Sequence, residues 1–473
     1  MTHGIGRRAL LGGGMAMAAM ARADIPIAKG RPGPAHRRFS SPAIEQAIAD
    51  VRAKMGPSAT AQKIGAMFAN CFPDTLDTTV EYDDRKGHPD TFVLTGDIAA
   101  MWLRDSTAQV WPYLPFCKAD PRLQRLIAGV IARQAANVLL DPYANAFNKD
   151  LAEVSEFAGD DTDMKPGLHE RKWEVDSLCN TIRLAHGYWR ATGDVSPFDA
   201  QWRRATRLIV DTFRIQQRKT GRGPYHFQRK TSWQPDTAPG AGYGNPVKPV
   251  GLIVSLFRPS DDAAILSFLV PANMFAVVSL RQLAEMQAIT GDSAFAAECR
   301  AFADEIEAAL HAYAIIEHPT HGHIWAYEVD GFGGRILMDD ANVPSLLSLP
   351  YLGWCGVDDP LYRATRSFVL SDDNPWFFKG RVAEGVGSPH TGANRVWPIA
   401  IVMRALTSND DAEIATALRM LAATDAGTGF IHEAFDPDDP ARFSRPWFAW
   451  ANTLFGEMVL KVATERPAVL ATL

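Results

Sequence analysis

Apolar residues recur at intervals of three and four along most of this chain, which is the spacing of one face of an α-helix. The first such segment follows Ser41-Pro42 and places Ile44, Ile48 and Val51 on one side of a helix that runs to about Met55. The same pattern predicts helices over 59–70, 98–113, 123–139, 173–192, 198–220, 271–290, 293–315, 342–349, 359–370, 394–407, 410–423 and 446–464.

Strand patterns are short and lie between the helices. Residues 75–83 and 91–94 alternate well enough to predict a strand pair around a polar turn, and residues 322–337 predict a small hairpin. The segments 141–167 and 221–256 are expected to be irregular. Helices paired through short turns, with long polar loops before every second helix, favour an all-α ring of helix pairs with its site at one end. Since no linker interrupts the pattern, residues 42–473 are expected to form a single domain.

The N-terminus has the pattern of an export signal. Arg7-Arg8 precede an apolar, glycine-rich run over 9–20, and Ala21-Arg22-Ala23 offers a small-x-small cleavage site. Residues 1–23 resemble a twin-arginine signal, which indicates a periplasmic location and no membrane attachment once the signal is removed. A Sec-type signal and a chance basic start are the alternatives. Residues 24–41, rich in Pro, Gly and Arg, are expected to form a loose arm.

Composition narrows the class of protein. The 473 residues are 47% hydrophobic and 22% charged, as in globular proteins, and carry a net charge of −6 with scattered Lys and Arg. That distribution disfavours nucleic acid as a partner. The 5 cysteines are odd in number and widely spaced, which is typical of core residues. Motifs for zinc, calcium, nucleotides or a serine nucleophile are absent from the sequence, so no metal or cofactor is expected. The oligomeric state stays open.

The segment 95–113 mixes aromatic and polar side chains in a way that suits a sugar. At helical spacing, Ile98, Met101, Trp102, Asp105 and Gln109 would share one face. Polar groups among aromatic rings can bind both the hydroxyls and the C–H faces of a saccharide. The alternative is a core helix in which Arg104 and Asp105 form a buried ion pair.

Three further segments carry candidate catalytic groups. Ser260 could cap a helix and leave Asp261 and Asp262 at its N-terminus, where acids commonly stabilise the helix dipole. Adjacent acids also repel, which would keep one of them protonated as a general acid requires. Glu433 lies in a predicted loop before a Trp-rich helix, although a loop carboxylate can be a plain surface charge. His390 could bind a ligand or act as a base, or be an ordinary core or surface histidine. Two carboxylates without metal or nucleotide motifs favour glycoside hydrolysis.

Several long segments resemble glycoside hydrolase family 125, the metal-independent exo-α-1,6-mannosidases. They are TGDIAAMWLRDSTAQVWPYL, KWEVDSLC, SLFRPSDDA with PANMF, FKGRVAEGVGSPHT with VWPIAI, and GFIHEAFDPDDPARFSRPWFAWANTLFGE. The resemblance spans about residues 42–464 in the family's order. It implies an (α/α)6 barrel that removes terminal α-1,6-linked mannose from mannans or N-glycan-like oligosaccharides with inversion, without metal.

The resemblance also implies a role for individual residues. Asp261 would be the general acid, with Asp262 as the alternative, and Glu433 would be the general base. The residues implied to bind mannose are Trp102, Arg104, Asp105, Arg258 and His390. Glu174, Asp176 and Asn273 lie in matching segments and would either contact the sugar or stand behind the residues that do. Two other readings stay open, an (α/α)6 glycosidase acting on α-glucosides and a glycan-binding protein without catalysis.

Overall fold

The structure is a computed structural model that describes residues 30–84 and 87–473. The export signal predicted for residues 1–23 lies outside the described residues, so the signal and the periplasmic location stay predictions. In the part of the chain that the structure describes, no helix has both the length and the apolar character needed to cross a membrane.

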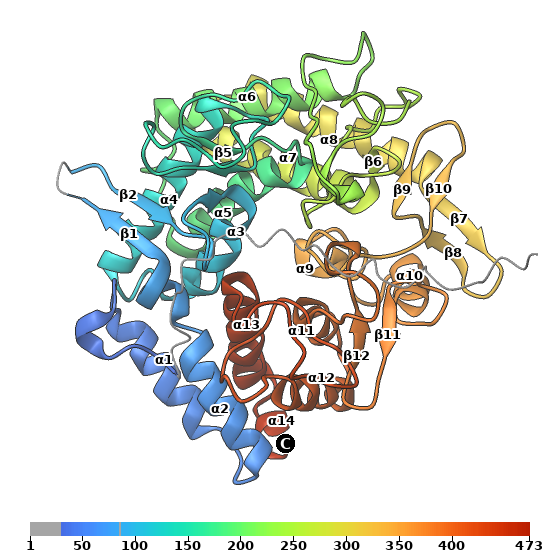
Figure 1. The fold of residues 1–473 in the computed structure, drawn as a ribbon. Helices are drawn as coiled ribbons and strands as arrows, with labels where there is room; N and C mark the ends of the chain where they lie inside the picture. Colours follow the sequence, from blue (N-terminus) through green and yellow to red (C-terminus); the bar gives the residue numbers. More distant parts are fainter. Residues whose placement is uncertain (1–29, 85–86) are drawn as a thin grey trace, which may run out of the picture.

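The helices form two concentric rings (Figure 1). The inner ring consists of α3 (Leu103–Val110), α5 (Val175–Thr192), α7 (Val270–Ile289), the short α9 (Leu349–Leu352), α11 (Pro398–Leu406) and α13 (Ala449–Glu465). The outer ring consists of α2 (Ala59–Cys71), α4 (Pro121–Leu140), α6 (Ala200–Gln216), α8 (Ser293–Tyr313), α10 (Pro360–Val369) and α12 (Asp411–Ala423). Helix α1 (Pro42–Ala53) packs on α2, and α14 (Pro467–Ala471) packs on α13. The predicted (α/α)6 architecture is confirmed.

The ring closes where the two ends of the domain meet. Helix α13, near the C-terminus, packs against both α2 and α3, near the N-terminus. Gly456 allows this approach, because a Cβ atom built there would lie 2.9 Å from the backbone of Phe72. Helix α7 is apolar on almost every side, as expected for a helix surrounded by α5, α8 and α9. One continuous hydrophobic core therefore runs through both rings.

Outer and inner helices begin differently. Each outer helix starts with a side-chain cap, provided by Ser58, Asp120, Asp199, Asp292, Asp359 and Asp410. The inner helices α3, α5, α7, α11 and α13 follow Trp102, Glu174, Leu269, Trp397 and Phe448, none of which caps the helix with its side chain. The first N–H groups of the outer helices thus donate to a side chain just before the helix. The inner helices have no such local cap, and in α5 the N–H of Val175 donates instead to Ser255 Oγ of a distant loop.

Small sheets decorate the loops. The predicted strand pair forms as β1 (Val80–Asp83) with β2 (Asp90–Val93), but the strand expected over 75–83 is shorter because Thr75–Thr79 form a π-helical turn. The predicted hairpin over 322–337 divides in two. β8 (Gly322–Trp325) pairs back with β7 (Ile315–His318), while β9 (Glu328–Val329) joins β10 (Arg335–Ile336) and β6 (Phe268–Leu269). Unpredicted are β11 (Phe377–Lys379) with β12 (Glu384–Val386), and the sheet of β3 (Met101–Trp102), β4 (Ala146–Phe147) and β5 (Leu168–Glu170).

Three sequence predictions are wrong in detail. The helix expected over 98–113 begins only at Leu103, because Met101 and Trp102 pair with β4, so the proposed helical face through Ile98 does not form. Residues 342–348 are bends and turns rather than a helix, and α9 follows them. Ser260 caps no helix, because the segment around it is a loop in which Asp261 has φ +66°, a left-handed conformation that ends regular structure.

Residues 30–41 are more ordered than the loose arm that was expected. Arg31 donates to Asp77 at 2.5 Å and to Glu45, and its side chain is only 14% exposed. Phe39 is buried, and its N–H donates to the carbonyl of Leu76 at 3.0 Å. The arm is held because its arginines neutralise Asp77, a buried carboxylate that would otherwise lack a counter-charge.

The contact at Gly456 yields a stability prediction. Gly456→Ala should lower the melting temperature by a shift equivalent to about 1–3 kcal/mol, because the added methyl group meets backbone that cannot move aside. Gly33→Ala, at a position with no neighbouring atom within 4 Å, is the control and should leave the melting temperature nearly unchanged. Thermal unfolding followed by circular dichroism measures both, and a more stable Gly456→Ala protein would contradict the close approach.

Candidate active site

The candidate site lies where the uncapped inner helices begin. The β3–β4–β5 sheet leads into α3 and α5, the 255–267 loop leads into α7, the turn Pro389–Thr391 precedes α11, and the 424–448 loop precedes α13. Each connection ends at the same end of the inner ring. The polar residues that these connections carry therefore meet, although they are far apart in sequence.

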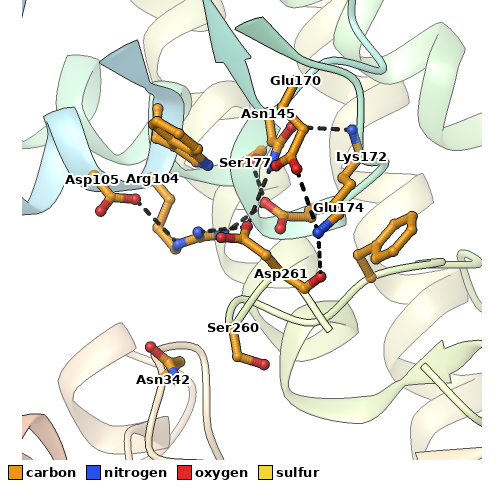
Figure 2. Close-up of polar contacts among 12 residues, drawn as sticks. Arg104, Asp105, Asn145, Glu170, Lys172, Glu174, Ser177, Ser260, Asp261 and Asn342 are labelled. Atoms are coloured by element: carbon orange, nitrogen blue, oxygen red, sulfur yellow. Dashed lines mark hydrogen bonds and ion pairs between the residues drawn. The ribbon is translucent and has the colours of Figure 1, made fainter. Parts of the chain in front are cut away.

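Arg104 is the centre of the charged network (Figure 2). Its side chain is 4% exposed and donates to Glu174 at 2.6 Å and to Asp261 at 3.2 Å. Asp105 and Asp176 each have an oxygen 3.5 Å from the guanidinium, and the ring of Trp450 lies 5.6 Å away. The Arg104–Asp105 pair considered from the sequence exists, but Glu174 is the closer partner. One cation thus faces four carboxylates.

Asp261 is held from two sides. Its Oδ1 accepts hydrogen bonds from Arg104 and from Asn145 Nδ2 at 3.3 Å, while its backbone carbonyl accepts from Lys172 Nζ at 2.9 Å. Figure 2 shows these three donors converging on the residue. The side chain stays 26% exposed, more than most acids around it. Burial alone would raise the pKa of Asp261, but the charges of Arg104 and Lys172 outweigh it and hold this pKa well below the usual range.

The neighbouring acids shift the other way. Burial raises the pKa of Glu174 well above its ordinary value, and the nearby negative charges of Asp261 and Asp176 add to that shift. Burial also raises the pKa of Asp105 and of Asp176 to about 6, although Arg104 opposes both shifts. The surroundings therefore favour the protonated form of Glu174 and the ionised form of Asp261, two carboxyl groups that both contact Arg104.

Asp262 points to a different partner from its neighbour. Its carboxylate is buried and lies 3.1 Å from His390 Nδ1. Burial lowers the pKa of His390, but the hydrogen bond and charge of Asp262, with the charges of Glu433 and Asp261, raise it to about 9. His390 is therefore an imidazolium at neutral pH. Only Asp262 contacts the ring directly, and Glu433 and Asp261 act on it through their charges.

Glu433 has a set of partners of its own. Its Oε2 accepts from Ser444 Oγ at 2.8 Å and its Oε1 from Arg445 Nη1 at 3.3 Å. Arg445 also pairs with Asp97 at 2.8 Å. Phe435 bridges to both Val396 and Phe443, which folds the loop back and brings Ser444 beside Glu433. The carboxylate is thus oriented without contact to Arg104.

Arg258 and Asn273 lie behind the exposed groups. Arg258 donates to Glu328 at 2.6 Å, and Glu328 also accepts from the backbone N–H groups of Ile265 and Leu266. Asn273 is fully buried and is bonded to the backbone of Ile253 and Leu269 through both its oxygen and its nitrogen. These bonds occupy the Asn273 amide, so of the two alternatives it takes the supporting one: it fixes the 253 loop on α7.

Buried polar atoms without a partner gather at this site. Among the described residues, these atoms accept or donate no hydrogen bond: Trp102 Nε1, Arg104 Nε, Asp105 Oδ2, Glu174 Oε1, Asp176 Oδ1, Arg258 Nη2 and Asp262 Oδ2. Such atoms are rare in folded proteins and costly to bury, so their concentration in one place points to a polyhydroxylated ligand.

The sequence reasoning missed several residues of the network. Asn145 and Lys172 support Asp261, and Arg445 supports Glu433. Lys172 lies within the KWEVD segment and could have been found from its company of charged residues. Asn145 becomes visible only through the β4 pairing that brings it beside Trp102. Nothing in the sequence pairs Arg445 with Glu433.

Comparison with known proteins agrees with this geometry. The sequence profile of the family described as "Metal-independent alpha-mannosidase (GH125)" matches residues 61–460. The "Meiotically up-regulated gene 157 protein" of Schizosaccharomyces pombe is 40% identical over 460 residues, which is 93% of this chain and 89% of the relative. A solved α-mannosidase structure from Streptococcus pneumoniae, described as a non-productive complex with α-1,6-mannobiose, is 43% identical. It covers 91% of this chain and 100% of its own, with a TM-score of 0.86.

More distant structures share only the fold. A bacterial glucoamylase complexed with acarbose is 14% identical and has a TM-score of 0.51, over 87% of this chain and 56% of its own. The predicted family resemblance is confirmed by the profile and by the two closer relatives. This chain belongs to the family of metal-independent α-mannosidases, glycoside hydrolase family 125.

Proposed function

We propose that this protein is an exo-acting, inverting α-mannosidase that removes terminal α-1,6-linked mannose from mannans or N-glycan-like oligosaccharides. The observation that carries the proposal is a pair of carboxylates, Asp261 and Glu433, that two separate loops hold with independent hydrogen-bond partners at the same end of the inner ring. Membership of an α-mannosidase family supports mannose as the sugar, and the α-1,6-mannobiose bound by the S. pneumoniae relative supports the proposed linkage.

In the proposed reaction, the protonated form of Asp261 gives its proton to the glycosidic oxygen as the bond to the anomeric carbon breaks. Glu433 removes a proton from a water molecule, whose oxygen attacks the anomeric carbon from the opposite face. The products are β-mannose and the shortened glycan. Inversion needs room for that water, so we expect the two carboxyl groups to lie roughly 6.5–9.5 Å apart.

The proton for the leaving group would come from the Glu174–Asp261 pair. Burial favours a proton on Glu174 in the free enzyme, and the charge of Asp261 adds to that preference. We propose that this proton passes to Asp261, which contacts the same guanidinium of Arg104, when the substrate binds. A sugar hydroxyl that accepts a hydrogen bond from Arg104 would weaken the ion pair between Arg104 and Asp261, and this would raise the pKa of Asp261. The transfer then moves one proton within the pair and changes no net charge.

Asp261 suits the acid's role better than Asp262. The Asp261 side chain is 26% exposed at the end of the ring, whereas that of Asp262 is 2% exposed and bonded to His390. We therefore propose that Asp262 acts through His390, by holding it charged and oriented toward the sugar. The unpartnered atoms of Trp102, Asp105 and Arg258 would take mannose hydroxyls.

The first test compares two substrates with different leaving groups. Asp261→Asn should lower kcat on α-1,6-mannobiose by about 10²–10⁴-fold but much less on α-mannosyl fluoride, because fluoride departs without a proton. Glu433→Gln should lower the rate on both substrates by a similar factor. Asp262→Asn should show neither pattern, and its kcat on α-1,6-mannobiose should fall less than that of Asp261→Asn or Glu433→Gln.

Glu307→Gln, an acid on the outer helix α8, is the matched control and should keep the wild-type rate. Circular dichroism confirms that each variant is folded. Near-normal hydrolysis of mannobiose by Glu433→Gln would remove Glu433 as the base, and an acid-variant phenotype in Asp262→Asn alone would move the acid to that residue.

The stereochemistry has a direct readout. Proton NMR during the first minutes of hydrolysis should show β-mannose before mutarotation produces the α anomer, and the same rate should persist in EDTA. Initial α-mannose would establish retention, and release of glucose instead of mannose from matched disaccharides would establish a different (α/α)6 glycosidase. Binding without hydrolysis would leave a glycan-binding protein.

The pKa of His390 gives a pH prediction. A histidine whose pKa is raised from 6.5 to about 9 stabilises the fold fully below the lower value and loses that contribution as the pH rises through about 9. NMR of labelled imidazoles should show His390 titrating near 9, and Asp262→Asn should move that midpoint toward 6.5. A His390 that is neutral at pH 7 in the wild-type enzyme would contradict the described pairing.

A further inference from the structure

Two histidines and an aspartate meet at the outer edge of the molecule. His318 ends β7, His321 lies in the turn to β8, and Asp373 lies between α10 and β11. One potential ligand atom from each side chain lies within 4.8 Å of the other two. Within residues 30–84 and 87–473 this is the one group of its kind. The β7–β8 hairpin stands at the rim beside α10, away from the inner ring (Figure 1).

The hairpin register determines which histidines can take part. His318 and Gly322 are paired, as are Ile316 and Ile324, and the two isoleucines are buried. Because side chains alternate along a strand, His318 shares their inward face, which packs on α10. His323 pairs with Glu317 and lies on the opposite face. The sequence HPTHGH therefore supplies two candidate ligands and one histidine that points elsewhere.

The geometry is partly organised for an ion. His321 Nε2 lies 2.9 Å from Asp373 Oδ2, and its Nδ1 lies 3.2 Å from Ser367 Oγ. Donation from Nδ1 to Ser367 leaves the Nε2 lone pair for a ligand bond, as outer partners of metal-bound histidines do. The His321 ring is 5.0 Å from that of His318 and 5.9 Å from that of Phe368, which fixes its plane.

We propose that His318, His321 and Asp373 form a binding site for a divalent transition metal, with Zn²⁺ as the best fit. Two imidazoles and one carboxylate suit a tetrahedral ion with water in the fourth position. Zn–N and Zn–O bonds of about 2.0–2.2 Å place neighbouring ligand atoms roughly 3.3 Å apart. The 2.9 Å contact between His321 and Asp373 needs to open by only a few tenths of an ångström.

Binding replaces three existing contacts. The hydrogen bond between His321 and Asp373 becomes a pair of metal bonds, and Ser371 Oγ gives up its 3.5 Å contact with His321 Nε2 but keeps its bond to the carbonyl of Phe368. The N–H of Thr320, which is exposed, donates to His318 Nδ1 at 3.2 Å and can turn to water if that nitrogen becomes the ligand. These losses are small because the groups stay near solvent or keep another partner.

The ion would have a structural role and would take no part in catalysis. It would join the β7–β8 turn to the segment that follows α10, which the turn already contacts through hydrogen bonds of His321 with Asp373 and Ser371 and through ring packing. The proposed mannosidase groups lie on the inner ring, so hydrolysis should not depend on this site. The proposal stands or falls independently of the proposed function.

The test uses the chain freed of metal with a chelator and then titrated with Zn²⁺. Calorimetry should show one equivalent bound, and Zn²⁺ at about 100 times its Kd should raise the folding equilibrium constant about 100-fold, seen as a higher melting temperature. His321→Gln and Asp373→Asn should each weaken binding at least 10-fold and abolish the thermal shift, with unchanged mannoside hydrolysis showing that the variants are folded.

His323→Ala is the matched control, since it removes a histidine of the same hairpin from the opposite face and should bind Zn²⁺ as the wild type does. Co²⁺ reports the ligands: a tetrahedral visible spectrum that disappears in His321→Gln supports the site. Equal binding by His321→Gln and wild type, loss of binding in His323→Ala, or a sulfur-to-cobalt band indicating a cysteine would each overturn the proposal.

Discussion

The buried guanidinium of Arg104 is the interaction on which the site depends. A cation taken out of water costs several kcal/mol unless acids compensate it, and Glu174, Asp261, Asp176 and Asp105 do so from three segments. The stabilisation is mutual, because each of those carboxylates would also be costly to bury without a counter-charge. Arg104 therefore joins the start of α3, the start of α5 and the 255–267 loop into one unit.

The way the helices begin explains why the site lies where it does. At the start of each outer helix, a Ser or Asp side chain accepts hydrogen bonds from the first N–H groups, so these groups do not depend on neighbouring segments for a partner. Inner helices begin without such caps: Arg104 lies in the first turn of α3, Glu174 directly precedes α5, and Glu433 lies in the loop before α13. Their first N–H groups favour negative charge, and Asp105 and Asp176 occupy the first turns of α3 and α5. The acids therefore gather at the end of the ring where the inner helices begin, whereas the outer helices carry ordinary N-terminal caps.

The sequence predicts the features that depend on residues close together along the chain, and it misses those that depend on contacts between distant segments. Helix pairs, and the start of α1 after Ser41, depend on neighbours a few residues away, and these predictions are confirmed. The β3–β4–β5 sheet joins strands of two or three residues across long loops, and strands this short show no alternating pattern from which they could be predicted. Ser260 was misjudged as a cap because the left-handed conformation of Asp261 is set by Arg104, Asn145 and Lys172, which come from other segments.

The candidate site shows the same division. Trp102, Arg104, Asp105 and Glu433 were found from local patterns and the family resemblance, and the structure brings them to one end of the ring. Asn273 was placed with the sugar-binding residues because its segment matches, yet its amide is occupied by backbone. Arg445 was missed because its partner Glu433 is 12 residues away through a folded loop.

The balance of charge around Arg104 has a chemical consequence. Four carboxylates face one guanidinium there, with Lys172 as the next cation, so they cannot all be ionised at neutral pH without strong repulsion. Burial therefore raises the pKa of Glu174, Asp105 and Asp176, while the exposed Asp261 is held ionised by its cations. The surroundings of Glu433 differ, because its carboxylate accepts from Ser444 and Arg445 and its charge helps to raise the pKa of His390. The two parts of the site thus differ in charge, with acids in excess around Arg104 and a cation bonded to Glu433, an asymmetry that suits acid–base cleavage of a glycosidic bond.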